Sequence, residues 1–87
     1  MDLRKIKLND MLKIRGEFYE VIGILQTAEC LPPKYEFKDI LEFSLFKKRS
    51  RGITPTHTLV FYLDSREISF SGEKEKYLKE SEIKIIS

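Results

Sequence analysis

Residues 13–24, KIRGEFYEVIGI, constrain the fold more than any other part of the chain, because they place strand-forming side chains around a central glycine. Apolar residues stand on both sides of Gly16, namely Met11, Leu12 and Ile14 before it and Phe18, Val21, Ile22, Ile24 and Leu25 after it. β-Branched and aromatic residues around a glycine that adopts positive φ are typical of a β-hairpin. The segment predicts a strand over 11–15, a tight turn at Gly16, and a strand over 17–27 that ends or bulges at Gly23.

Two later segments also alternate as strands do. In residues 36–46 one face carries Phe37, Leu41, Phe43 and Leu45. A helix over 39–46 fits part of this spacing, but the aromatic residues and the lack of a cap pair favour a strand. Residues 57–63 form the strongest predicted strand, with Leu59, Phe61 and Leu63 inward. Asp64-Ser65 then predicts a hairpin turn, followed by a returning strand over 66–70.

The remaining segments are less regular. Residues 3–8 predict a short edge strand or an ordered arm, and Pro32-Pro33 make residues 28–35 a predicted loop, because proline donates no ladder hydrogen bond. Residues 73–80 favour one or two helical turns. A last strand is expected at the C-terminal end, through Ile83, Ile85 and Ile86.

Five or six short strands with hairpin connections close most economically into a partly open barrel. We therefore expect an all-β chain with a single domain over 1–87. An SH3-like barrel with one short helical turn near the C-terminus is the leading architecture, and an oligonucleotide-binding (OB-type) barrel is the alternative.

Composition bears on the source organism and the cellular compartment of the chain. It is 41% hydrophobic and 34% charged, with the charge carried mainly by Lys and Glu, a bias that predicts a thermophilic, archaeal source. The single cysteine, Cys30, excludes an intramolecular disulfide, and we expect it to be half-buried and unreactive. No apolar run approaches the ~20 residues that span a bilayer, and residues 1–8 lack the apolar core of a signal peptide. These features predict a cytoplasmic protein with no membrane partner.

One dense cluster of charge stands out. Lys47, Lys48, Arg49 and Arg51, hereafter the basic loop, fall within five positions and precede Gly52. Phosphate backbones favour such clusters because counterions are released on binding. His57 follows and is a candidate to stack on bases, so these five residues are the predicted RNA- or DNA-binding set. A solvated loop and a contact with an acidic protein surface are the other interpretations.

Little in the sequence predicts catalysis. His57 is the only histidine and has no second His or Cys to complete a metal shell, so we expect no metal. The four glycines are dispersed rather than gathered into a phosphate-binding loop. The carboxylates of residues 73–82 alternate with lysines, which is typical of a solvated face. We therefore expect no enzyme activity, no cofactor and no small-molecule substrate.

Residues 2–5 and 9–21 resemble the start of the elongation factor P family of translation factors, whose SH3-like (KOW-type) N-terminal domain opens with a Lys-Ile-x-Gly-Glu-Pro-Tyr-x-Val hairpin. The resemblance covers about a quarter of the chain. Phe18 stands where that family has proline, and the loop at residues 29–34 lacks the glycine-flanked lysine that receives the family's modification. The resemblance thus implies the hairpin geometry and not the ribosomal function.

A second pattern is similar to an uncharacterised family of small β domains, with a Gly-x-x-Tyr-x-Val-x-Gly hairpin and a later Glu-aromatic-x-Leu strand. Here the hairpin residues are Gly16, Tyr19, Val21 and Gly23, and the strand is residues 42–45. This resemblance implies a fold and no chemistry.

The sequence therefore predicts a non-enzymatic binding module that contacts nucleic acid weakly and without sequence preference through the basic loop. The alternative is a protein–protein module, self-associating or docking a partner on an exposed sheet edge. It rests on apolar residues expected to point away from the main core: Ile40, Phe46, Val60 and Tyr62.

Overall fold

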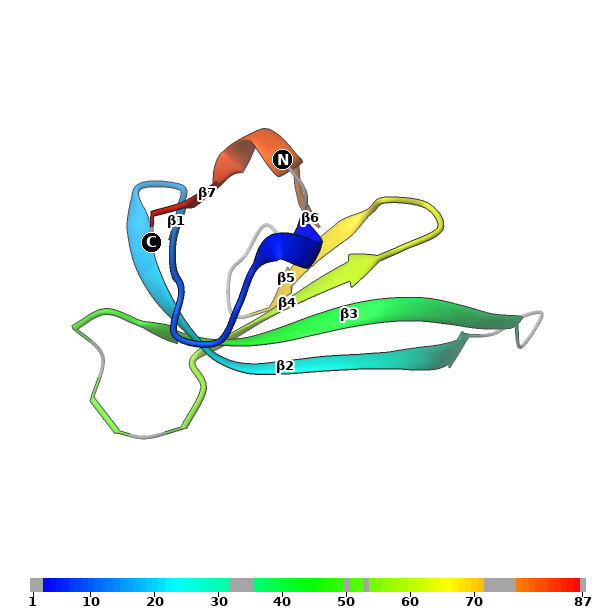
Figure 1. The fold of residues 1–87 in the computed structure, drawn as a ribbon, viewed down its shortest axis with the longest axis horizontal. Coiled ribbons are helices and arrows are strands. Elements are labelled where there is room, and N and C mark those ends of the chain that lie inside the picture. The colour runs from blue at the N-terminus through cyan, green and yellow to red at the C-terminus, as the bar shows by residue number, and fades with distance from the viewer. Residues whose placement is uncertain (1–2, 32–35, 50, 53, 72–76, 87) are drawn as a thin grey trace.

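The computed structural model describes residues 3–31, 36–49, 51–52, 54–71 and 77–86, and these form one antiparallel sheet (Figure 1). Its seven strands lie in the order β6-β5-β4-β3-β2-β1-β7. The strands are β1 (Met11–Ile14), β2 (Glu17–Leu31), β3 (Glu36–Lys47), β4 (His57–Tyr62), β5 (Ile68–Ser71), β6 (Tyr77–Leu78) and β7 (Ile83–Ile85). Two short 3-10 helices, η1 (Leu3–Lys5) and η2 (Glu80–Glu82), complete the described elements.

The sheet curls into a half-barrel. Its two edge strands, β6 and β7, are separated in the chain by Lys79 and η2 alone, so the two edges must approach each other. The side chain of Arg15, at the end of β1, bridges the gap by donating to the Tyr77 carbonyl oxygen at 2.9 Å. The all-β, barrel-like class expected from the sequence is therefore confirmed, with more strands than the five or six predicted.

The concave face of the half-barrel holds the core. The predicted alternation is confirmed for Phe43 and Leu45 on β3 and for Leu59 and Phe61 on β4, all of them buried, and Tyr19 and Val21 of β2 are buried on the same face. Leu63 is partly buried and packs against this core, and the side chain of Phe37 lies outside what the structure describes. Leu3 and Ile6 join the core, so the N-terminal segment is an ordered arm that contains a 3-10 turn.

A bulge divides β2 into two halves. The register with β3 shifts between Val21 and Gly23, which leaves Ile22 as the extra residue. An added Cβ on Gly23 would lie 3.2 Å from the Cβ of Ser44, so the two strands approach closely at this point. Bulges bend a strand and increase its twist. Beyond this one, β2 and β3 continue as a long hairpin arm that extends past the other strands (Figure 1).

Several boundaries differ from those predicted. β2 continues through Leu31, so residues 28–31 are strand rather than loop, while the Pro32-Pro33 segment lies outside the described residues. Cys30 is exposed, not half-buried, because it lies on the hairpin arm beyond the core. Tyr77 and Leu78 form β6 instead of a helix, since Leu78 pairs with Ile68 of β5. Residues 73–76 of the predicted helical turn lie outside the described residues.

Candidate nucleic-acid interface

The basic loop begins where β3 ends. Lys47 is the last residue of that strand, and Lys48 and Arg49 form the turn that follows it. Lys48, Arg49 and Arg51 are exposed, and the connection from β3 to β4 projects away from the sheet (Figure 1). The backbone of Arg49 adopts a φ of 72°, a left-handed conformation that sharpens the turn. Three cationic side chains therefore face solvent within four positions.

Hydrogen bonds fix both ends of this connection. The Lys48 N–H donates to the Phe18 carbonyl oxygen at 2.9 Å, and the Lys47 N–H donates to the Thr56 hydroxyl at 2.8 Å. The Thr56 N–H in turn donates to the Leu45 carbonyl oxygen at 2.9 Å. The exposed cations are therefore carried by a loop whose ends are held against β2 and β3.

The local sequence leaves this charge without a neutralising carboxylate nearby in the chain. No aspartate or glutamate occurs between Glu42 and Asp64, whereas four basic residues lie in that interval. Clustered charge of one sign raises the local concentration of oppositely charged ligands more than net charge does. The chain as a whole carries a net charge of only +2, so the loop is a local rather than a global source of positive potential.

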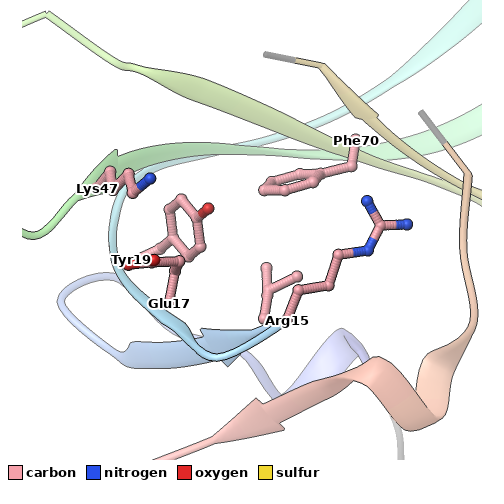
Figure 2. Close-up of a pocket in the computed structure, with 6 residues that line it drawn as sticks. Arg15, Glu17, Tyr19, Lys47 and Phe70 are labelled. Carbon is pink, nitrogen blue, oxygen red and sulfur yellow. The ribbon is translucent and has the colours of Figure 1, made fainter. Parts of the chain in front are cut away.

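Lys47 differs from the rest of the basic loop because it lies on the concave face. It pairs with Tyr19 of β2 and lines a pocket of about 200 Å³ together with Ile14, Arg15, Glu17, Tyr19 and Phe70. Figure 2 shows the Lys47 ammonium and the Arg15 guanidinium on opposite sides of the two aromatic rings. Because Glu17 supplies a carboxylate to the same pocket, its lining is mixed in charge and does not select an anion.

Arg15 already has structural partners on the far side of this pocket. Its Nη2 donates to the Tyr77 carbonyl oxygen, and its Nε lies 3.5 Å from Oε1 of Glu82. The backbone N–H of Lys79 and the Arg15 guanidinium both favour the ionised carboxylate, and they hold the pKa of Glu82 below its ordinary value. We call this arrangement of Arg15, Glu82 and the Lys79 N–H the Arg15 clamp.

His57 is buried, unlike the exposed Lys48, Arg49 and Arg51 with which it was predicted to bind nucleic acid. It is only 9% exposed, and its ring stacks on Phe70 with centroids 5.1 Å apart. The Tyr19 ring lies nearly perpendicular to the same ring, with centroids 4.9 Å apart. Its Nδ1 lies 2.9 Å from the Thr56 hydroxyl, with which it shares a hydrogen bond. These contacts make His57 a packing residue at the rim of the core, with one ring face stacked on Phe70.

Phe18 is the aromatic residue that the sequence reasoning passed over. It was counted among the apolar residues of the hairpin, but its side chain is 43% exposed and lies on the convex face. The signal was present in the alternation, because Tyr19 and Val21 both point inward and the residue directly before Tyr19 must point outward. The carbonyl of Phe18 is also the acceptor that anchors Lys48.

The described residues contain no group of three or more His, Cys, Asp or Glu side chains placed to hold a metal ion. No helix in this part of the chain is long and apolar enough to cross a membrane. Comparison of the chain with protein-family models, curated proteins and solved structures finds no match. The two family resemblances therefore remain predictions.

Proposed function

We propose that this chain is a non-enzymatic binding module on an SH3-like barrel, and that it contacts RNA or DNA weakly and without sequence preference. The observation that carries the proposal is the set of three exposed cations, Lys48, Arg49 and Arg51, on a loop fixed at both ends. Contacts to phosphates carry no sequence information, so a loop of this kind gives affinity rather than specificity.

The anchoring supports this proposal over a merely solvated loop. A cation on a freely moving loop loses more conformational entropy on binding than one whose backbone is already held. Here the backbone N–H of Lys48 donates to β2. On the other side of the loop, the N–H of Thr56 donates to β3, and the Lys47 N–H donates to the Thr56 hydroxyl. Lys47 contributes less to the proposed contact, because its side chain turns toward the concave face.

The proposal is tested by fluorescence anisotropy with labelled single-stranded RNA, single-stranded DNA and duplex DNA at low and moderate salt. We expect micromolar affinity that falls as salt rises. The variant Lys48→Glu/Arg49→Glu/Arg51→Glu should lose this binding, and its melting temperature should stay close to that of the wild type because the three side chains are exposed. If three contacts to a single strand are lost, the slope of log K against log salt falls by about 2.

A matched pair of variants separates position from net charge. Arg49→Glu/Arg51→Glu and Lys5→Glu/Lys79→Glu change the net charge equally, and all four side chains are exposed. We expect the first variant to lose most of the affinity and the second to keep most of it. Equal losses would assign the binding to overall charge and remove the basic loop from the proposal.

A second candidate function, self-association through a sheet edge, rests on the hairpin arm. β1 pairs with β2 only from Glu17 to Glu20, so among the described strands residues 23–28 of β2 have β3 as their sole neighbour. Ile24 and Leu25 are 38% and 54% exposed in this stretch. The apolar residues that the sequence analysis expected on this surface support self-association less well. Ile40 is buried, and Phe46, Val60 and Tyr62 are half-buried.

A further inference from the structure

A row of outward-facing side chains crosses the convex face beside the basic loop. Lys13 of β1 lies directly opposite Lys84 of β7 on one side and Phe18 of β2 on the other. Residues that lie opposite each other in antiparallel strands point to the same face of the sheet. Lys84, Lys13 and Phe18 therefore form a continuous row, hereafter the Phe18 row.

The row continues into the basic loop. Phe18 accepts the backbone hydrogen bond of Lys48, the first residue after β3. From Lys84 to Lys48 the row crosses three strand spacings, about 14 Å. Lys48 of the loop and the cations of the row thus lie along one line, with the exposed ring of Phe18 between them.

The ring of Phe18 is fixed in place. Phe18 belongs to β2, which a two-residue turn joins to β1, and the Lys13 ammonium lies 5.6 Å from the centroid of the Phe18 ring. With 43% of the residue exposed, part of the ring remains available to a ligand. A held aromatic ring flanked by cations is the arrangement on which single-stranded nucleic acids stack their bases, because every base presents a π-face and the cations meet the phosphates.

The neighbouring rows do not share this chemistry. One step along the strands, Met11 of β1 lies opposite Glu20 of β2, which lies opposite Phe46 of β3. The carboxylate of Glu20 places a negative charge at the edge of the Phe18 row. Repulsion from Glu20 therefore disfavours a phosphate backbone that crosses the sheet in that direction, and on the other side of the row Glu82 lines a small pocket with Lys13 and Lys84.

We propose that the Phe18 row is a base-stacking platform for single-stranded nucleic acid, with one unpaired base on the Phe18 ring and the adjoining phosphates on Lys13, Lys84 and the exposed cations of the basic loop, Lys48, Arg49 and Arg51. This inference rests on the proposed nucleic-acid binding and deepens it, because it names the strand state of the ligand. Paired bases are stacked inside a duplex and cannot reach the ring, so the platform favours single strands over duplexes.

The test compares two labelled probes of about ten nucleotides, oligothymidylate and an abasic strand with the same number of phosphates. Wild-type protein should bind oligothymidylate more tightly than the abasic strand. Phe18→Ala should weaken oligothymidylate binding by about 5- to 150-fold, the range measured for loss of one stacked base. Its affinity for the abasic strand and for duplex DNA, and its salt slope, should be unchanged.

Tyr77→Ala is the matched control, because Tyr77 is an aromatic residue of β6 that is 73% exposed and is not a member of the Phe18 row. It should bind both probes as the wild type does. Phe18→Leu, which keeps an apolar side chain but removes the ring, should behave as Phe18→Ala does and separates stacking from a folding defect.

The outcomes distinguish the platform from the basic loop. Equal affinity of the wild type for the two probes, or unchanged oligothymidylate binding by both Phe18 variants, overturns the platform while leaving the loop proposal in place. Absence of binding to every probe at low salt overturns both. Preferential binding of an acidic peptide over oligothymidylate assigns the same cations to a protein partner and likewise overturns the platform.

Discussion

Gly16 controls the turn on which both proposed surfaces depend. It has a φ of +81°, and Arg15 before it has a φ of 51°, so both central residues of the two-residue turn are left-handed. Such turns match the twist of the flanking strands. An added Cβ on Gly16 would meet no atom within 4 Å, so the cost of Gly16→Ala is conformational alone. We expect Gly16→Ala to lower the free energy of unfolding by about 1 kcal/mol.

Urea denaturation measures this loss, and Gly16→Asn provides the comparison. Asparagine tolerates left-handed backbone better than alanine does, and Asn9 already adopts a φ of 70° in this chain. The asparagine variant should therefore fall between the wild type and the alanine variant. An alanine variant as stable as the wild type would mean that the turn relaxes to another geometry.

Individual residues also show how far the sequence can be interpreted by itself. Strand alternation correctly placed Phe43, Leu45 and Leu59 in the core, because inward and outward positions follow from a local rule. The same rule also points His57 inward, on the same face of β4 as Leu59, although the sequence reasoning assigned it to nucleic-acid contact. Its burial depends on Phe70 and Tyr19, which come from two other strands.

Among the elements, the Arg15 clamp joins the β1–β2 turn to η2. The folded state lowers the pKa of Glu82 from its ordinary value of 4.5, so the ionised carboxylate stabilises the fold. A lowered folded pKa gives stability that is present above the unfolded pKa and is lost as pH falls through the folded pKa. The wild type should therefore exceed Glu82→Gln in urea midpoint at pH 7, and the difference should shrink as pH falls below 4.5.

Glutamine keeps an oxygen that can accept from the Lys79 N–H, so Glu82→Gln removes the charge and not the hydrogen bond. Asp64→Asn, at an exposed turn position, corrects for the general effect of losing one negative charge. A difference between wild type and Glu82→Gln that stays constant from pH 7 to pH 3 would exclude the clamp as its source.

What the sequence missed depends on pairing between strands, which no single segment shows by itself. β6 has two residues, and its Glu- and Lys-rich surroundings favour a helix, so only pairing with β5 makes it a strand. The last strand was predicted, but its pairing with β1 was not. That pairing places Lys84 beside Lys13, which is why the Phe18 row could not be found from the sequence although each of its residues was visible there.

At the scale of the whole molecule, the hairpin arm and the cationic surfaces occupy different ends of β2. Phe18 precedes the bulge, whereas the exposed edge of residues 23–28 follows it. A second copy that pairs with this edge would extend the sheet and leave the Phe18 row and the basic loop accessible. Self-association and nucleic-acid binding are therefore compatible in one assembly, and a dimer would present two sets of cations.

This arrangement predicts a dimer that forms as concentration rises, measured by size-exclusion chromatography with light scattering against the chain mass of 10.3 kDa. Ile24→Lys should restore the monomer, because lysine on an exposed strand edge opposes further pairing.

Since two linked sites bind a long strand more tightly than either alone, Ile24→Lys should weaken binding to long single strands and leave binding to short ones unchanged. A wild type that stays monomeric at every concentration excludes the edge as a self-association surface, and the monomer is then the nucleic-acid-binding unit.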